Sequence, residues 1–451
     1  MKRLRNLVRQ QSKNPNAIAY AAMAVAGLTF PGIVQFATGG NADYLVSLAA
    51  DAGVFVLLAI GLNVVVGFAG LLDLGYAAFF AIGSYTYGML ASQQLISSPL
   101  HTALHVPFWI ALVLGMFIAA GAGALLGAPT LRLRGDYLAI VTLGFGEIVP
   151  RFFRNMREWT SGVNGISALD VPTLPFWITG PWANAELAIE QNFRFVTFNA
   201  TAWYVLIVIL IVGSVIGVNN LHGSRLGRAW MAVREDETAA AAMGVNTVNT
   251  KLLAFAIGAS FSGFAGAFYG AKLSLVSPES FGFVVSITIL SMVVLGGMGN
   301  IPGAMVGAIL LYAVLYKFLP DAPLQASSLA HSLGMDWLNT VVPDGWPGIG
   351  EFVSRLKFII FGLILVTIML VRPQGLLPSR LRAQELKRGV HDEPVSTAPA
   401  RPPCSTASPA CTSRPRARSC SKAATSRVPS PTAPRSWASP ARSRTSACSS
   451  T

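Results

Sequence analysis

Long apolar stretches alternate with shorter polar segments along most of this chain. The apolar stretches are about 20 residues long, which is the length that an α-helix needs to cross the hydrocarbon core of a bilayer. We therefore predict an all-α integral membrane protein with about ten transmembrane helices. The predicted spans are residues 17–36, 44–67, 72–93, 107–128, 136–153, 201–219, 250–273, 281–298, 302–320 and 355–371.

The composition excludes an ordinary soluble protein. Of the 451 residues, 53% are hydrophobic and only 12% are charged, and the mean hydropathy is +0.55. Residues 1–16 precede the first predicted span, are rich in Lys and Arg, and lack the small-residue pattern of a cleavable signal peptide. We expect this basic segment to stay in the cytoplasm, and because the number of spans is even, we expect both termini to be cytoplasmic.

A charged, alanine-rich segment, Ser224–Lys251, lies between two predicted spans. Within it, Arg228–Met243 contains strong helix formers and neither Gly nor Pro, so we predict one helix of about four turns. Gly244 is expected to end that helix, and Asn246–Asn249 to make the turn into the next span. A solvated connecting helix would have the same composition, but the order of the residues is more particular than such a helix needs.

That order resembles the coupling loop of ABC importer permeases, in which a short helix docks into a groove on a cytoplasmic ATPase. The string GRAW…REDE…AAMGVN…KLLAF is similar to the branched-chain amino acid ABC transporter permeases, in particular to the M-subunit branch of the Liv-type uptake systems. The resemblance implies the permease fold of the branched-chain amino acid and ribose type. It also implies that the following residues couple this chain to the ATPase: Gly227, Arg228, Ala229, Arg234, Glu235, Glu237, Ala240 and Gly244.

A second string that resembles this family, GLNVVVGFAGLLDLGYAAFFAIGSYTYGML, lies within Ala50–Leu90. Its small residues let helix backbones approach closely or break locally. Asn63 and Asp73 in this string are candidate residues of the substrate pathway, because an ionisable group near membrane depth is a functional candidate by default. A position for Asp73 in a short cytoplasmic turn between the second and third spans is the alternative.

A third string of the family covers Leu131–Ile166 and adds Glu147 and Asn164 to the pathway candidates. An unpaired charge at Glu147 would be costly in an apolar segment. One interpretation is an ion pair with Arg151, one helical turn further on, and the other is a contact to the amino group of a passing amino acid. Asn164 belongs to a turn-rich loop on the proposed outer face, where a substrate or a delivery protein would arrive.

The seventh predicted span carries small residues four positions apart. Such a stripe lets two membrane helices pack closely, either within the subunit or across a dimer. It therefore indicates a helix contact and says nothing about the substrate. The stripe consists of Gly258, Ser262, Gly266 and Gly270.

Residues 381–451 form a low-complexity tail that contains all four cysteines, so no disulfide framework or metal site is indicated in the membrane part. From Pro394 onward there are nine basic and no acidic residues, and without them the net charge of +13 falls to about +4. The basic pI therefore implies no nucleic-acid partner. The composition by itself predicts disorder.

A shifted reading frame gives a sharper interpretation of the tail. With permitted codons, Thr397–Thr412 reads one base back as NGAGKTTLFNGITGLY, Cys420–Val428 as LLEGRDITG and Trp437–Ser449 as LGIARTFQNIRLF. The first contains the core of a phosphate-binding P-loop, and all three, in this order, resemble the ATPase of the same uptake system. Our hypothesis is that the tail is frame-shifted ATPase-gene sequence. In the frame as translated, it forms no nucleotide site.

The resemblance implies a permease domain over residues 17–380 of an ATP-driven importer of branched-chain amino acids (Leu, Ile, Val) in the bacterial inner membrane. The implied partners are a second permease subunit, two cytoplasmic ATPase subunits, a periplasmic or lipid-anchored amino acid-binding protein and membrane lipid. ATP would be bound by the ATPase, so we expect neither a cofactor nor a metal in this chain, and no enzymatic activity of its own.

Two rival functions remain open. A permease for another small solute, such as urea, another amide or a sugar, would share the architecture. An ion-coupled secondary transporter would need coupling-ion ligands at mid-membrane and no ATPase, and the long Ser224–Lys251 segment argues against it. A membrane enzyme has less support, because the five histidines are scattered and no HExxH motif or nucleophile elbow is present.

Overall fold

The computed structural model describes residues 27–36, 43–97, 104–130, 136–167, 169, 170, 172 and 200–332, and a discontinuous set between 351 and 377. Contacts divide the chain into two units, Met1–Glu393 and Pro394–Thr451, and every described residue belongs to the first. The predicted N-terminal segment 1–16, the connection 173–199 and the tail 381–451 lie outside the described residues.

The described residues are almost entirely helical, as predicted. The larger helices are α3 (Asp43–Leu62), α4 (Tyr76–Leu90), α6 (Phe108–Thr130), α7 (Asp136–Asn155), α11 (Ala200–Gly223), α12 (Arg225–Glu235), α14 (Thr247–Leu273), α15 (Phe283–Gly296), α16 (Ile301–Ala313) and α17 (Leu319–Ser332). The shorter ones are α5 (Gln94–Ser97), α8 (Arg157–Thr160), α13 (Glu237–Ala242), the 3₁₀ turns η2 (Gly162–Asn164) and η3 (Pro278–Phe281), and the π-helices η1 (Asn63–Phe68) and η4 (Val314–Phe318).

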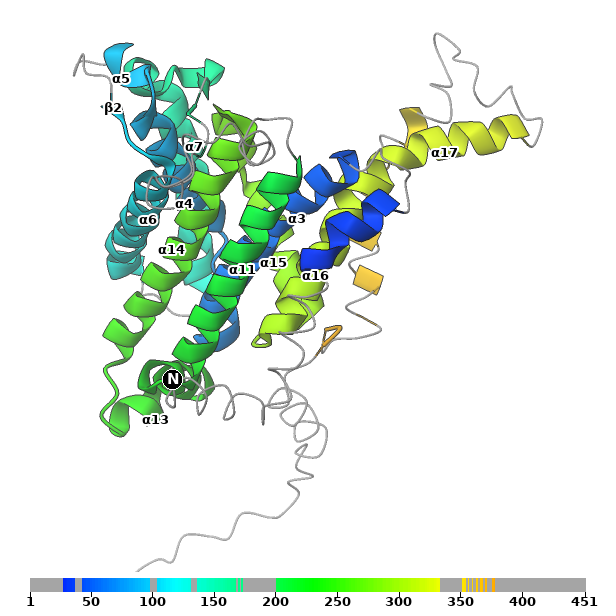
Figure 1. Ribbon diagram of the computed structural model, residues 1–451. Helices are drawn as coiled ribbons and strands as arrows, with labels where there is room; N and C mark the ends of the chain where they lie inside the picture. The colour runs from blue at the N-terminus through cyan, green and yellow to red at the C-terminus, as the bar shows by residue number, and fades with distance from the viewer. Residues whose placement is uncertain are drawn as a thin grey trace, which may run out of the picture. The chain divides into compact units, whose positions relative to one another are not determined.

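Two antiparallel strand pairs, each two residues long, join loops of the bundle. The strand β1 (Ala91–Ser92) pairs with β2 (Leu104–His105), with Ala91 opposite His105. The strand β3 (Ile166–Ser167) pairs with β4 (Leu275–Val276), with Ile166 opposite Val276. These pairs follow the C-terminal ends of α4 and α14, whereas α12 and α13 lie beside the N-terminal end of α14, at the opposite end of the bundle (Figure 1).

A helix occupies each predicted span from the second to the ninth. Six helical stretches among the described residues are long and apolar enough to cross a membrane, namely Asp43–Phe68, Phe108–Pro129, Ala200–Gly223, Thr247–Leu273, Pro278–Gly296 and Ile301–Ser332. The prediction of about ten spans is not confirmed. The helix α4 is only 15 residues long, and α7 carries polar residues on one face, so neither meets the criteria of length and composition.

The helix α14 is the centre of the bundle, since it packs most extensively against α6 and α4 and also contacts α3 (Figure 1). Its small-residue stripe meets α4 of the same chain. The Oη of Tyr76 donates to the carbonyl oxygen of Gly258 at 3.0 Å, and the Oγ of Ser84 donates to that of Gly266 at 2.6 Å. A Cβ on Gly266 would lie 2.3 Å from the carbonyl oxygen of Phe80. The stripe therefore serves close packing within this subunit.

The helix α3, which begins at Asp43, continues into a wider π-helical turn. Residues Asn63–Phe68 form a turn of π-helix, and Gly70 then adopts a positive φ of 70°. A side chain at Gly70 would also collide with Arg234, whose Cγ lies 2.7 Å from the position of the missing Cβ. This confirms the expected local break in the glycine-rich string, and single π turns inside helices occur frequently at functional sites.

Candidate coupling site and substrate pathway

The segment Ser224–Lys251 forms two helices, and the prediction of one continuous helix was wrong. The helix α12 ends at Glu235 and α13 begins at Glu237, because Asp236 has extended backbone angles (φ −152°, ψ 111°). Its carboxylate accepts hydrogen bonds from the N–H groups of Thr238 and Ala239 and thereby caps α13. The hydroxyl of Thr238, followed by these two N–H groups, lowers the pKa of the Asp236 carboxyl below its ordinary value.

Both ends of the two-helix segment have sequence signals that act as caps. The Oγ of Ser224 accepts from the N–H groups of Leu226 and Gly227, so α12 begins at Arg225, earlier than predicted. Gly244 has a φ of 86° and ends α13 as predicted. Its N–H donates to the carbonyl oxygen of Ala241, and the N–H of Val245 donates to that of Ala240. Asn246 makes no separate turn but caps α14 directly.

Buried residues attach this segment to the membrane helices. Trp230 is fully buried, and its Nε1–H donates to the carbonyl of Thr250 on α14 at 2.8 Å. The Nζ of Lys251 lies 2.7 Å from the carboxylate of Glu237, and the lysine side chain is only 9% exposed. Glu237, which we expected on the ATPase-facing surface, thus points back toward α14. These contacts hold α12 and α13 to the N-terminal turn of α14.

The opposite side of the segment is exposed and consists largely of small and apolar groups. Met243 is 85% exposed, and the alanines beside it on α13 leave the backbone accessible. The predicted coupling residues divide between the two sides. Gly227 and Ala240 are buried and Ala229, Arg234 and Glu237 half-buried, whereas Arg228, Glu235 and Gly244 are exposed along with Ala239, Ala241, Ala242 and Met243.

Arg234 connects the coupling segment to the interior of the bundle. Its guanidinium donates to the carbonyl oxygen of Gly67 in the π-helix η1. The same guanidinium passes Gly299, which lies in the turn between α15 and α16. The N–H of Gly299 in turn donates to the Oδ1 of Asn63 at 2.8 Å, and Asn63 is fully buried. The structure therefore brings a predicted coupling residue, Arg234, and a predicted pathway residue, Asn63, to the same junction.

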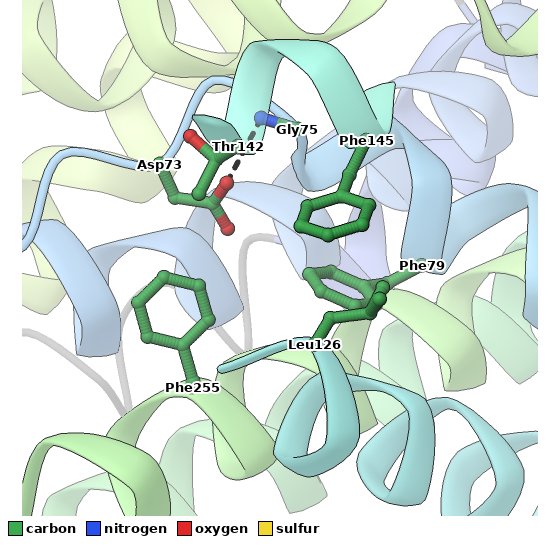
Figure 2. Close-up of a pocket in the computed structure, with 7 residues that line it drawn as sticks. All are labelled: Asp73, Gly75, Phe79, Leu126, Thr142, Phe145 and Phe255. Carbon is green, nitrogen blue, oxygen red and sulfur yellow. Dashed lines mark hydrogen bonds between the residues drawn. The ribbon is translucent and has the colours of Figure 1, made fainter. Parts of the chain in front are cut away.

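Asp73 lies in the connection 69–75 between η1 and α4, in agreement with the turn that we considered, but it is buried there. Figure 2 shows its carboxylate pointing into a small cavity between α4, α6, α7 and α14. The volume of this cavity is about 10 Å³, which is enough for about one water molecule. The cavity is lined by Asp73, Gly75, Phe79, Leu126, Thr142, Phe145 and Phe255.

Only one of the two carboxylate oxygens of Asp73 has a partner among the described residues. Its Oδ1 accepts from the N–H of Gly75 at 2.9 Å, and its Oδ2 is buried without a hydrogen bond. Burial raises the pKa of this carboxyl to about 6, because the charged form loses its hydration. The site can therefore hold a proton or a water molecule, but its volume is too small for an amino acid.

The other two pathway candidates lie apart from this cavity. The carboxylate of Glu147 is 3.2 Å from the guanidinium of Arg151, and both side chains are substantially exposed, so the ion-pair interpretation is confirmed. Asn164 lies on the exposed turn η2, next to the strand pair β3–β4 and far along the chain from the coupling segment. The structure thus places the four candidates in four separate locations.

The sequence reasoning missed a buried ion pair between two spans. The Nζ of Lys272 on α14 lies 2.5 Å from the Oδ1 of Asp51 on α3. The available signal was a single acidic residue inside the second predicted span and a single basic residue near the end of the seventh, since isolated charges in apolar spans require a partner. The two residues are 221 positions apart, so nothing local linked them.

Comparison with known protein families gives an extended match. The family described as "Branched-chain amino acid transport system / permease component" matches residues 44–323. The high-affinity branched-chain amino acid transport system permease protein LivM of Salmonella typhimurium is 38% identical over 350 residues, which cover 76% of this chain and 72% of that protein.

Two further relatives extend the comparison. LivM of Escherichia coli K12 is 37% identical over 378 residues, covering 82% of this chain and 76% of that protein. The permease protein LivH of Salmonella typhimurium is 25% identical over 329 residues, which cover 72% of this chain and 91% of that protein. This chain is therefore similar to two differently named permeases of branched-chain amino acid transport systems. No solved structure matches it.

Proposed function

Since this chain belongs to the family of permease components of branched-chain amino acid transport systems, we propose that it is the membrane-spanning permease subunit of an ATP-driven importer of leucine, isoleucine and valine. It is a multi-pass membrane protein, as its six long apolar helices and its relatives indicate. We further propose the bacterial inner membrane as its location, with both termini in the cytoplasm.

The observation that carries this proposal is the identity of 38% to a LivM permease over three quarters of the chain. The family match, over residues 44–323, includes both the second span and the coupling segment. Similarity to LivH as well supports a working unit built from two related permeases. Two cytoplasmic ATPases and an amino acid-binding protein complete the proposed complex, with ATP bound by the ATPases and no cofactor in this chain.

The coupling segment offers the surface that a docking ATPase needs. The exposed alanines of α13 and Met243 present a small apolar ridge, and Arg228 and Glu235 are exposed on α12 beside it. On the other side, Trp230 and Lys251 fix the segment to α14. A movement imposed on the ridge would therefore be passed to α14, and through Arg234 to η1.

The test is leucine uptake into membrane vesicles that carry this chain with its cognate second permease, ATPases and binding protein. Gly244→Val is the perturbing variant, because a β-branched residue is strained at a φ of 86° and would disrupt the C-terminal cap of α13. Gly244→Asn is the matched control, since Asn is tolerated in this conformation. We expect uptake that requires ATP, is lost with Val and is largely retained with Asn.

Uptake without ATP, or equal uptake in both variants, would contradict the coupling role and favour an ion-coupled secondary transporter. ATP-dependent uptake of urea or of a sugar, with no uptake of leucine, would keep the mechanism and replace the substrate.

A further inference from the structure

The buried ion pair between α3 and α14 has no role in the coupling described so far. Lys272 is only 7% exposed, and its Nζ donates both to Asp51 at 2.5 Å and to the carbonyl of Ser47 at 2.9 Å. The side chain of Asp51 is 27% exposed, so it is less deeply buried than its partner. The pair lies near the C-terminal end of α14, at the end of the bundle opposite the coupling segment (Figure 1).

A cluster of aromatic rings lies beside the pair. The ring of Phe55, which follows Asp51 by one turn of α3, lies 5.1 Å from the ring of Tyr312 and 5.6 Å from that of Tyr316. Tyr312 and Tyr316 are themselves stacked at 4.4 Å. Tyr269 on α14 lies within electrostatic reach of Asp51 and of Tyr316. The surroundings of the pair are therefore apolar ring faces with a few hydroxyl groups at their edges.

Part of this aromatic cluster is exposed in the portion of the chain that the structure describes. Tyr316 is 42% exposed and Tyr44 62% exposed, and the Nζ of Lys317 lies 5.8 Å above the Tyr44 ring. These residues and Asp51 belong to stretches that are long enough to span a membrane. A partly exposed carboxylate at such a depth is costly against lipid, and such groups face the interior of a helix bundle or a water-filled cavity.

We propose that Asp51 and Lys272, with the rings of Phe55, Tyr269, Tyr312 and Tyr316, form a binding site for zwitterionic α-amino acids with apolar side chains. The inference rests on the proposed function and names the part of the chain that recognises the substrate. The ammonium group of the amino acid takes the place of Lys272 at the Asp51 carboxylate. Its carboxylate takes the place of Asp51 at the Lys272 ammonium group, and the apolar side chain packs on the rings.

Charge balance explains why the proposed ligand is a zwitterion. Opening the pair inside the membrane leaves two charges without partners, which is costly unless both find new ones. An α-amino acid supplies an ammonium group and a carboxylate two bonds apart and restores both contacts at once. An amine or a carboxylic acid of the same size restores only one and leaves the other charge unpaired. The closed pair thus selects for molecules that carry both charges.

The direct test is thermal unfolding of the purified membrane complex in detergent, without the binding protein, in the presence of millimolar ligands. We expect leucine to raise the midpoint, because a ligand that binds only the folded state stabilises it. Isoamylamine, which lacks the carboxylate, and 4-methylpentanoate, which lacks the amino group, should leave the midpoint unchanged. Stabilisation by either analogue equal to that by leucine, or no stabilisation by leucine, would overturn the proposal.

The second test separates binding from a purely structural ion pair. The double variant Asp51→Lys/Lys272→Asp keeps an ion pair between the two helices but exchanges its charges, which would turn a bound amino acid around and move its side chain off the rings. We expect this variant to insert and to unfold near the wild-type temperature, but to lose leucine uptake by about tenfold or more and to lose the leucine effect on its midpoint. The exposed pair Glu147–Arg151, exchanged in the same way, is the control that should keep uptake.

The outcomes distinguish this proposal from the function on which it rests. A wild-type complex that shows ATP-dependent leucine uptake, together with an exchanged variant of equal activity, would leave the permease function in place and refute the binding site. A wild-type complex that takes up no leucine would refute the proposed function itself.

Discussion

Arg234 is the residue whose replacement should separate ATP hydrolysis from transport. Its guanidinium is a charged donor to the carbonyl oxygen of Gly67 in η1, 167 positions earlier in the chain. A hydrogen bond to a charged group contributes about 1.5–3 kcal/mol. Arg234→Met removes that contribution while the aliphatic part of the side chain stays in place against Gly70. If this bond holds the coupling segment to η1, its loss shifts the equilibrium by about 10- to 100-fold toward the state in which the segment is separated from η1.

The assay is the ratio of leucine transported to ATP hydrolysed in reconstituted vesicles. We expect Arg234→Met to hydrolyse ATP at a rate close to that of the wild type and to transport leucine about 10- to 100-fold more slowly. Arg234→Lys keeps the charge but loses the planar fork, and should fall between the two. The matched control is Arg225→Met, because Arg225 is exposed on the first turn of the same helix. An unchanged ratio in Arg234→Met, or an equal loss in the control, would refute the link through η1.

Three further predictions concern stability, measured as thermal unfolding in detergent. Gly266→Ala should destabilise by about 1–3 kcal/mol, because its Cβ would lie 2.3 Å from a carbonyl oxygen of α4, whereas Gly213→Ala, with open space around it, should be neutral. Glu237→Gln should lower the midpoint by leaving its buried lysine partner on α14 without a counter-charge, whereas Glu235→Gln, on the exposed side, should not. Burial raises the pKa of Asp73 from 3.8 to about 6, so its contribution to stability is complete below pH 4 and is lost as the pH rises through 6. At a pH above 7, Asp73→Asn should therefore raise the midpoint temperature of thermal unfolding. An unchanged midpoint at that pH would contradict the burial argument.

The position of the coupling segment could be predicted, but its internal structure could not. The composition of Arg228–Met243 favours a helix throughout, and no Gly or Pro interrupts it. The break at Asp236 occurs because its carboxylate can cap a new helix, while Glu237 is drawn back to Lys251. The cap is a local effect of Asp236 on the residues that follow it, and the helix propensity of the whole stretch concealed it. The ion pair depends on where α14 lies relative to the segment, and no local pattern contains that position.

The same limit applies to the pathway candidates. Asn63 and Asp73 were singled out because they are polar groups near apolar spans, and the structure does bury both. Only the fold shows that Asn63 meets the turn of Gly299 next to Arg234, and that Asp73 faces a cavity with room for one water. Asp51 and Lys272 escaped attention because they lie 221 positions apart and nothing local links them.

The sequence by itself determined the class of the protein, the course of eight internal helices and the place of the coupling segment between two of them. These features depend on runs of neighbouring residues, because a helix in a bilayer satisfies its own backbone and needs only length and apolar side chains. The tertiary structure alone decided which polar groups meet. In the membrane interior each such group must find its partner within the protein, and the partner of Asp51 lies 221 residues away. Arg234 lies outside the spans, and its partner Gly67 is 167 residues away.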